Sequence, residues 1–367
     1  VLAFPAGAVV GDTVTLLKSG ETAGEGIAVT CSVGERDTNR AYLEVVDGKL
    51  RLAKKNETGK VIEATATITW SKDGRTLSKP VTVNLYPAAS SRKTLMNSIA
   101  ATYTNSSSDW VVFDMAAYAK CGFGSNTTDT ENYLNLTINE LAGTSPLATD
   151  RTKAEIILAA LGIDSTRLTP LGGAEYSNAA KLAAMNLGTS HYTAPWVLLA
   201  EQAGQMKLSD KQRSSMISLL TSSLGPDGLF VTKWAGETYA DPDTTGTALT
   251  ALAAYADRAA VKSFIDKAVA GLSKAQNSNG SYGNVNSDAM VIIGLAAVGI
   301  DPASDERFVK GGCSLADALL LYVNDGQNGF TAGYISGTQG EKAQALATEQ
   351  GFRALVTLEQ FAKDTSK

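Results

Sequence analysis

An acidic pair opens the stretch YADPDTTGTALTALAAY, residues 239–255, immediately before a run that favours a helix. Asp241 and Asp243 are close enough in sequence for one carboxylate to raise the pKa of the other, which is how a proton donor can be built. Asp243 is equally placed to cap the helix by accepting backbone N–H bonds, a contribution of about 1 kcal/mol. We expect capping, because similar acidic helix starts recur elsewhere in the chain. These other starts are at Asp109, Asp150, Asp288 and Glu349.

Aromatic and acidic side chains near the expected starts of the apolar helices form the set of candidate ligand-binding residues. Aromatic rings at such places can line a pocket, although packing between helices is their more common role. The set comprises Tyr192, Trp196, Trp234, Tyr239, Asp243, Tyr282, Asp288 and Glu349. For an enzyme, we expect Asp243 to be the general acid and Asp241 its partner.

The cysteine and histidine content argues against a metal site. Cys31, Cys121 and Cys313 lie far apart and form no C-x-x-C pair, and His191 is the single histidine. We therefore expect no metal and no other cofactor. A Cys121–Cys313 disulfide remains open, but free buried thiols are the favoured interpretation.

Two kinds of periodicity divide the chain. Residues 1–87 alternate with period two, and Asp-Gly pairs at 47–48 and 73–74 predict hairpin turns. From residue 91 onward the period is helical, with a short linker between the two parts. We expect a small antiparallel β-sandwich over residues 1–87 and a separate helical domain over residues 91–367.

The helical part repeats itself. AEIILAALGID, ending at Asp164, returns as MVIIGLAAVGIDP around Asp301, which is typical of stacked helix pairs. Apolar helices, which should be buried, alternate with amphipathic ones, which should face solvent on one side. The pattern predicts an all-α (α/α)6 toroid. The apolar inner helices are expected near 108–120, 149–162, 192–204, 243–257, 286–299 and 346–363, and the outer ones near 92–103, 129–142, 174–187, 208–224, 260–276 and 311–324.

Several motifs carry a resemblance to a known family. QNSNGSY, residues 276–282, has the Q-x3-G-x-aromatic spacing of terpenoid cyclases of the squalene-cyclase type. The run from SDAMVIIGLAAVGIDP to ATEQGFRALVTLEQF resembles terpenoid cyclase-like and prenyltransferase-like toroid domains on Gram-positive surface proteins. KPVTVNLYP, residues 79–87, looks like the last strand of a bacterial immunoglobulin-like domain. The resemblance implies an immunoglobulin-like sandwich followed by a terpenoid cyclase-like toroid, over roughly residues 220–363 by sequence and 91–220 by architecture.

The same resemblance bears on catalysis. In a class II cyclase the middle acid of an Asp-x-Asp-Asp motif protonates the substrate. DPDT keeps Asp241 and the middle position, Asp243, but Thr244 replaces the last acid. The resemblance thus implies a binding protein more than a cyclase.

Charge and hydrophobicity exclude some classes of binding partner. A net charge of −5 and a pI near 5.2 argue against nucleic acid, and no apolar run approaches the roughly 20 residues that span a bilayer. The chain opens at VLAF without a methionine, so we expect a fragment of an exported protein, extracellular or attached to the cell wall.

The expected function is non-catalytic binding or adhesion at the toroid cavity. The expected partner is a small molecule, a glycan, or a host or cell-wall protein. Two alternatives remain: a terpene cyclase-like enzyme using Asp243, and an (α/α)6 carbohydrate-active enzyme. The second would use two carboxylates about 5–9.5 Å apart, from Asp243, Asp288 and Glu349.

Overall fold

The computed structural model describes residues 1–16, 23–332 and 342–365. These residues form two compact units. Unit 1 comprises Val1–Leu95, Gln276–Val285 and Pro302–Gln344, and unit 2 comprises Met96–Ala275, Asn286–Asp301 and Ala345–Lys367. The C-terminal third of the sequence therefore contributes to both units.

The described residues of unit 1 form two sheets from its N-terminal segment, a third sheet of two short antiparallel strands at residues 309–314, and several short helices. The larger sheet has the order β1-β7-β6-β3, with β1 parallel to β7 and the other pairs antiparallel. The smaller sheet has the order β2-β5-β4 and is antiparallel. The strands are β1 Leu2–Phe4, β2 Thr13–Val14, β3 Ala28–Val33, β4 Leu43–Val46, β5 Lys49–Leu52, β6 Ile62–Lys72 and β7 Arg75–Leu85.

The long β6–β7 hairpin organises this unit. Asp73 and Gly74 both have positive φ, 51° and 74°, which is the backbone that a tight two-residue hairpin turn requires. Along β6 the small and apolar side chains Ala64, Ala66 and Ile68 are buried, and they alternate with threonines. The buried face of the hairpin packs with Phe4, Leu43, Leu50, Leu52, Val83 and Leu85 in one hydrophobic core.

The sequence-based fold class was wrong. Unit 1 is not an immunoglobulin-like sandwich: its larger sheet is mixed, and β1 and β2 are only three and two residues long. The chain also does not pass from an all-β part to an all-α part, because β8 (Phe230–Trp234) and β9 (Glu237–Asp241) interrupt the helices. Period-two alternation is common to all half-buried sheets, so it predicted the strands without predicting their order.

Short elements complete unit 1. The segments from the C-terminal third contain β10 (Val309–Lys310), β11 (Cys313–Ser314) and α11 (Leu315–Ala318). A long helix was expected at 311–324, but Gly311 and Gly312 both have positive φ and form a turn at its predicted start. Three 3-10 helices also belong to this unit: η1 Arg40–Tyr42, η3 Glu306–Phe308 and η4 Leu319–Tyr322.

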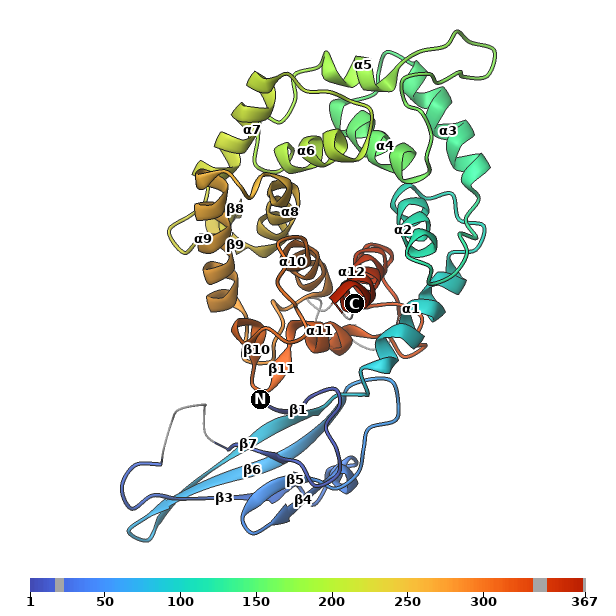
Figure 1. The fold of residues 1–367 in the computed structure, drawn as a ribbon. Coiled ribbons are helices and arrows are strands. Elements are labelled where there is room, and N and C mark those ends of the chain that lie inside the picture. Colours follow the sequence, from blue (N-terminus) through green and yellow to red (C-terminus); the bar gives the residue numbers. More distant parts are fainter. Residues whose placement is uncertain (17–22, 333–341, 366–367) are drawn as a thin grey trace. The chain divides into compact units, whose positions relative to one another are not determined.

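Unit 2 is built around a ring of apolar helices (Figure 1). α2, α4, α6 and α8 pack side by side in this order, and α12 packs against α2. α10 lies between α8 and α12 (Figure 1). The side-chain amide of Asn286 in α10 donates to Gln350 Oε1 in α12 at 2.7 Å. The helices of the ring are α2 Asp109–Lys120, α4 Ala148–Ala160, α6 Ala194–Ala203, α8 Pro242–Leu252, α10 Val285–Ala297 and α12 Ala345–Thr365.

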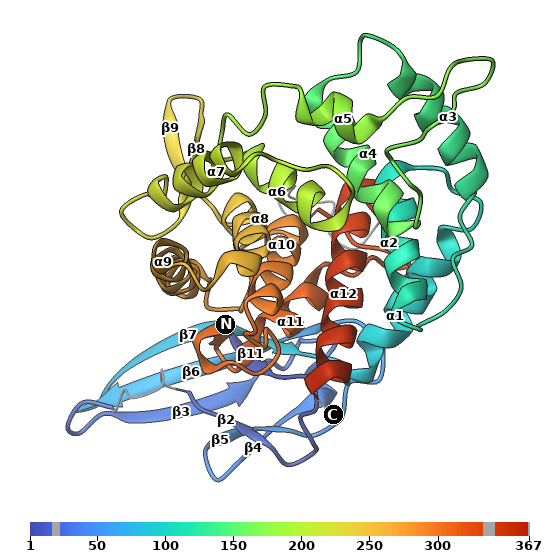
Figure 2. The same cartoon turned by 45° about the horizontal axis from the view of Figure 1, so that its top comes forward.

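Glycine brings two helices of the ring into backbone contact. A Cβ on Gly246 of α8 would lie 2.3 Å from the carbonyl oxygen of Met290 in α10. A Cβ on Gly294 would lie 2.5 Å from the carbonyl oxygen of Gly246. Figure 2 shows α8, α10 and α12 running side by side. This close approach lets the α8–α10 interface exclude water without large side chains.

Amphipathic helices lie outside the ring. α9 buries Val261, Phe264, Ala268 and Leu272, a spacing that places one apolar stripe against the ring. α5 is much shorter than the helix expected at 174–187, because Ser177 caps it and the preceding residues form a bridge between Leu168 and Tyr176. The outer helices are α3 Thr130–Ala142, α5 Asn178–Ala183, α7 Asp210–Ser222 and α9 Ala259–Ala275, and α1, Ser90–Thr102, enters unit 2 at Met96.

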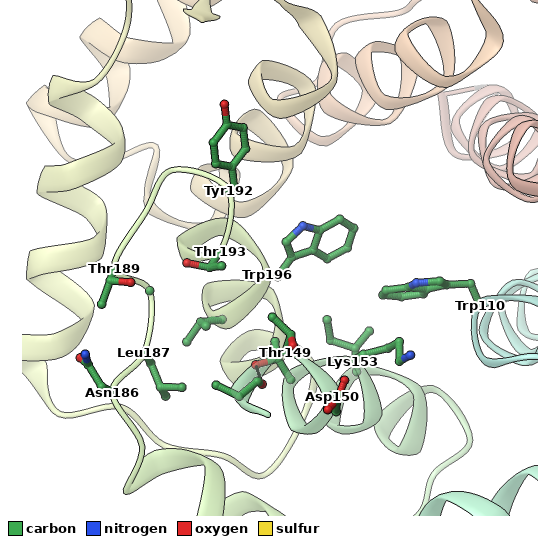
Figure 3. A pocket seen from close by; sticks show the side chains of 15 residues that line it. Trp110, Thr149, Asp150, Lys153, Asn186, Leu187, Thr189, Tyr192, Thr193 and Trp196 are labelled. Carbon is green, nitrogen blue, oxygen red and sulfur yellow. Dashed lines mark hydrogen bonds between the residues drawn. The ribbon is translucent and has the colours of Figure 1, made fainter. Parts of the chain in front are cut away.

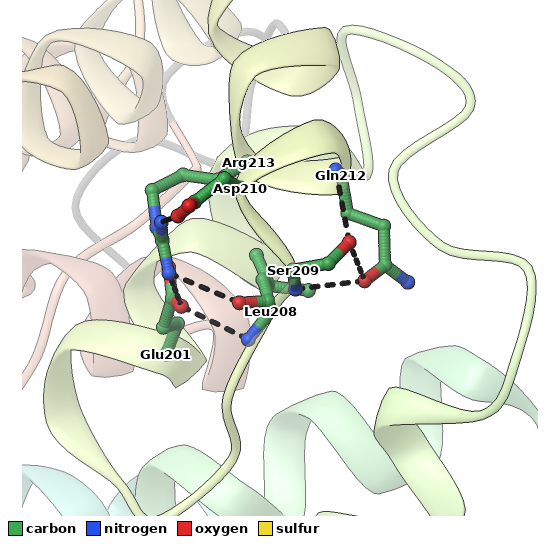
Figure 4. Close-up of polar contacts among 6 residues, drawn as sticks. All are labelled: Glu201, Leu208, Ser209, Asp210, Gln212 and Arg213. Atoms are coloured by element: carbon green, nitrogen blue, oxygen red, sulfur yellow. Dashed lines mark hydrogen bonds and ion pairs between the residues drawn. The ribbon is translucent and has the colours of Figure 1, made fainter.

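A charged network fixes α7 to α6 (Figure 4). The Arg213 guanidinium of α7 donates to both oxygens of Glu201 in α6, at 2.9 and 2.6 Å. Ser209 and Gln212 form a reciprocal capping box at the start of α7. Although burial of Glu201 opposes ionisation, hydrogen bonds from Arg213 and Leu208 bring its pKa below the usual value.

Candidate functional site

A cavity of about 570 Å³ opens at the N-terminal ends of three neighbouring ring helices, α2, α4 and α6 (Figure 3). It lies entirely within unit 2. A volume of this size can hold a small molecule or a few units of an oligomer. The cavity is lined by Trp110 of α2, by residues 148–150, 152, 153 and 156 of α4, and by residues 186–189, 192, 193, 196 and 197 in and before α6.

Three aromatic rings mark one side of this cavity. The ring centroids of Trp110 and Trp196 are 5.3 Å apart, with their planes inclined by 46°. Both indoles are half-buried, and Tyr192 is 46% exposed on the loop that leads into α6. Figure 3 shows Trp110, Trp196 and Tyr192 following one another along the cavity. The three rings together offer an apolar surface that remains accessible to a ligand.

The loop that carries Tyr192 is anchored by its neighbour. The imidazole of His191 stacks on Phe230, with 5.0 Å between ring centroids and 13° between planes. Phe230 is fully buried at the start of β8, and its backbone N–H donates to Thr245 Oγ1 at 3.1 Å. The single histidine of the chain therefore packs against the core and positions the cavity loop.

Polar and charged groups surround the aromatic side. Lys153 of α4 forms an ion pair with Asp109 of α2. Asp150 accepts from the Leu147 N–H at 2.8 Å and so closes the first turn of α4. Because Lys153 and Asp109 largely neutralise each other, Asp150 leaves the immediate lining slightly acidic.

A buried ionic network stands behind Trp110. The Arg353 guanidinium of α12 donates to both oxygens of Asp114, at 2.6 and 3.2 Å, and to Glu349 Oε1 at 3.0 Å. It also lies over the Trp110 ring at 4.9 Å and the Phe113 ring at 5.4 Å from their centroids. This arrangement joins the last helix of the ring to the first and fixes one wall of the cavity.

Burial dominates the electrostatics of this network. The Asp114 side chain is fully buried, which raises its pKa to about 7 although Arg353 acts to lower it. Burial also raises the pKa of Glu349, and Arg353 again opposes the shift. Asp109 and Lys153 influence Glu349 electrostatically, so Glu349 lies near the charged rim of the cavity.

The predicted ligand-binding residues do not form one cluster. Tyr192 and Trp196 line the cavity. Glu349 accepts a hydrogen bond from Arg353, whose guanidinium lies over the ring of the cavity residue Trp110. Tyr239 is 49% exposed on β9, and Trp234 lies on β8 in a part whose side chain the structure does not describe. Asp288 is buried in the first turn of α10. Tyr282 belongs to unit 1.

The acidic pair at the start of α8 has two distinct roles. Asp241, not Asp243, is the N-cap: its Oδ1 accepts from the Thr244 N–H at 2.9 Å and its Oδ2 from the Thr244 hydroxyl at 2.8 Å. Asp243 lies inside the helix and accepts a hydrogen bond from the Ser287 hydroxyl of α10. Burial raises the pKa of Asp243, and the charge of Asp241 adds to this. Its observed contact links two ring helices.

Sequence reasoning missed three important side chains. Trp110, Lys153 and Arg353 belong to the cavity or its supporting network but were not among the candidates. Trp110 follows one of the recurrent acidic helix starts, which was an available signal. Lys153 lies more than one turn into α4 and Arg353 more than two turns into α12, and only the closure of the ring brings them near Trp110.

Three further features of the described residues concern metals, thiols and membranes. Within the described ranges, no group of three or more His, Cys, Asp or Glu side chains could hold a metal ion. Cys31, Cys121 and Cys313 are free thiols. No helix among the residues placed in the structure is long and apolar enough to cross a membrane.

The similarity of the chain to known proteins is low. No family model and no curated protein matches the chain. Among solved structures, it is similar to a family 76 glycoside hydrolase from a bovine Bacteroides thetaiotaomicron strain, with a TM-score of 0.39 and 10% identity over 92% of this chain and 93% of that chain. At this TM-score we derive neither fold nor activity from the likeness.

The expected relationship to terpenoid cyclases and immunoglobulin-like domains has no support among the family models. No family model matches the chain, so none supports the terpenoid cyclase-like, prenyltransferase-like or immunoglobulin-like assignments, and the mixed larger sheet of unit 1 differs from the expected sandwich. Those assignments were wrong. The Q-x3-G-x-aromatic motif has a structural role here: Gln276 donates its side-chain amide to the carbonyls of Gly280 and Phe308, at 2.6 and 3.0 Å. The motif therefore stabilises a turn, which is not specific to one family.

Proposed function

We propose that unit 2 binds a neutral oligosaccharide in the cavity at the N-terminal ends of α2, α4 and α6. The observation that carries this proposal is the succession of Trp110, Trp196 and Tyr192 along a cavity with a polar rim. Sugar rings have faces of polarised C–H groups, which pack well on the negative π face of an aromatic ring. Their hydroxyls need hydrogen-bonding groups around that face.

The polar side of the cavity fits this ligand. Thr149 and Thr193 provide hydroxyl groups, and Asp150 and Lys153 provide charged ones. Sugar hydroxyls can donate to a carboxylate and accept from an ammonium group. An isoprenoid chain would cover these polar groups, displace water from them and offer no hydrogen bond in exchange, which costs affinity. The rim therefore favours a sugar over a purely apolar ligand.

The balance of charge argues for a neutral sugar. Lys153 is already paired with Asp109, and Asp150 adds a negative charge to the lining. An acidic sugar would meet a carboxylate without an available cation to compensate it, so we expect uronic acid polymers to bind more weakly. Adhesion, as distinct from glycan binding, has no support of its own in the structure.

A binding screen tests the proposal. The intact chain is titrated with neutral glucan, mannan and xylan oligosaccharides and with an oligogalacturonide, by isothermal calorimetry. We expect at least one neutral oligosaccharide to bind, and Trp196→Ala to weaken it at least tenfold, which corresponds to about 1.4 kcal/mol. Trp70→Ala, which removes an indole from unit 1, is the matched control and should leave the affinity unchanged. Binding of the acidic oligosaccharide alone would contradict the proposal.

Hydrolysis of the bound sugar is a second candidate, favoured by one observation. Burial raises the pKa of Glu349, although Arg353 opposes this shift, and Asp109 is a second carboxylate near it. A general acid beside a second carboxylate is the arrangement that glycoside hydrolysis uses. In this scheme Glu349 protonates the leaving oxygen of the glycosidic bond, and Asp109 takes a proton from the water molecule that attacks the anomeric carbon. Release of reducing sugar by the native chain and its loss in Glu349→Gln, with binding retained, would support hydrolysis. Equal product release by both proteins would exclude this role.

A further inference from the structure

A second surface with ligand-binding features lies in unit 1, at the turn end of the β6–β7 hairpin. Figures 1 and 2 show this end of β6, β7 and β3 extending away from β4 and β5. The strand register pairs Trp70 with Val29 on one side and with Leu77 on the other. It also pairs Lys72 with Arg75 and Ile68 with Lys79. Directly paired side chains point to the same face, so these residues share one face of the sheet.

This face continues the core-bearing face of the sheet. Ala64, Ala66 and Ile68 on the same side of β6 are buried, but two residues further on Trp70 is only half-buried. Leu77 beside it is 68% exposed. A hollow of about 610 Å³ lies here, bordered by Ile27, Trp70, Lys72, Arg75 and Leu77 among others. Among the residues that the structure describes, the smaller sheet does not cover this apolar strip, which can therefore contact a partner.

Cations flank the apolar strip on both sides. Lys72 and Arg75 lie on the turn side of Trp70 and Leu77, and Lys79 lies on the other side. All three are exposed, and none forms a salt bridge with another residue that the structure describes. Asp73 of the turn also borders the hollow, so these three cations and one carboxylate carry a net charge of +2 in a chain with a net charge of −5. This local positive charge favours an anionic partner.

The spacing of these rows suits an extended polypeptide. Alternate residues of a strand are about 6.8 Å apart. Along the hairpin, the cationic pair Lys72 and Arg75, the apolar pair Trp70 and Leu77, and the cation Lys79 therefore follow one another at that interval. An extended peptide projects residues i, i+2 and i+4 from one side with the same interval. In a segment of the pattern acidic–x–apolar–x–acidic, the two acidic side chains can therefore pair with the two cationic rows, and the apolar side chain can pack on the row between them.

We propose that this face, which we name the hairpin face (Val29, Trp70, Lys72, Arg75, Leu77 and Lys79), docks an extended acidic polypeptide segment. The carboxylates of the segment pair with Lys72 or Arg75 and with Lys79, and its central apolar side chain packs on Trp70 and Leu77. A polyanion without apolar groups would leave Trp70 and Leu77 unused. A flat lipid surface would not fill the hollow. The inference is independent of the sugar-binding proposal, because it concerns unit 1.

The test uses fluorescein-labelled peptides and fluorescence anisotropy with the full chain. One peptide has glutamate, serine, leucine, serine and glutamate in this order between glycines. A second has the same composition with both glutamates next to the leucine, and a third has lysine in place of glutamate. We expect only the first to bind well, with affinity falling several-fold when salt rises from about 50 to about 200 mM.

Matched variants separate a specific site from general attraction. The triple change Lys72→Glu, Arg75→Glu and Lys79→Glu should weaken binding at least tenfold, and Leu77→Ser should weaken it without changing the salt dependence. The triple change Arg36→Glu, Lys49→Glu and Lys55→Glu alters the charge of unit 1 equally at other exposed positions and should have little effect. Equal losses in both triples, equal binding of the first two peptides, or binding of anionic vesicles or heparin in preference to the peptide would each overturn the proposal.

Discussion

Removing the guanidinium of Arg353 tests the buried network behind the cavity. In Arg353→Met a side chain of similar length keeps the packing but leaves Asp114, whose side chain has no exposed surface, without its bidentate partner. Breaking a buried pair from one side costs about 3–5 kcal/mol when the remaining group stays charged. Asp114 can avoid part of this cost by holding a proton, so the loss of stability should depend on pH.

The sign follows from the pKa of Asp114. In the native chain burial raises this pKa to about 7, so stability from the protonated carboxyl is full at acidic pH and is lost as pH rises through about 7. Arg353 acts to lower this pKa, so its removal moves the titration of Asp114 above 7. Above about pH 7 the native chain has levelled off while the variant continues to lose stability. The difference should grow by up to about 1.4 kcal/mol per pH unit.

Urea unfolding followed by far-ultraviolet circular dichroism, at about pH 6, 7, 8 and 9, measures this difference. The double variant Asp114→Asn with Arg353→Met removes the buried charge, so its stability relative to the native chain should depend much less on pH above 7. Glu349, the other carboxylate that accepts from Arg353, has 14% of its side chain exposed, and burial raises its pKa. A pH-independent difference for Arg353→Met, or the same pH dependence in the double variant, would refute the reasoning.

Two further predictions concern α8. Asp241→Ala should destabilise unit 2 by about 1 kcal/mol because the helix loses its cap, whereas Asp243→Asn should cost less and should gain relative stability as pH rises, since burial raises the pKa of Asp243. Thermal unfolding of both variants at two pH values checks this, and a larger loss in Asp243→Asn at alkaline pH would contradict it. Gly246→Ala should destabilise unit 2 by about 1–3 kcal/mol or more despite the better helix propensity of alanine, because its Cβ would meet the Met290 carbonyl. Gly299→Ala, at a position with no atom near the added Cβ but a φ of 79°, would give only the smaller cost of strain, and an equal or greater loss there would contradict the packing argument.

The helices were largely predictable, because they depend on local periodicity. α3 was expected at 129–142 and spans Thr130–Ala142, and α9 was expected at 260–276 and spans Ala259–Ala275. The failures have local causes. Gly311 and Gly312 begin a turn inside a predicted helix, and Ser177 shortens α5.

The sheets and the site were less predictable, because both depend on contacts distant in sequence. Alternation located the long hairpin but gave no sign that β1 would add to β7 in parallel. Tyr192 and Trp196 were predicted as ligand-binding residues from their place at a helix start, and both line the cavity. Trp110 reaches them only when α2 and α6 come together across α4, and Arg353 reaches Trp110 only when α12 closes the ring.

The most direct test of the central claim is the affinity of the native chain and of Trp196→Ala for neutral oligosaccharides. The account predicts saturable binding to the native chain, at least tenfold weakening in Trp196→Ala, and no change in Trp70→Ala. Equal affinity in all three proteins would show that the sugar binds elsewhere. An absence of binding to any neutral oligosaccharide by a folded native chain would contradict the assignment of the cavity.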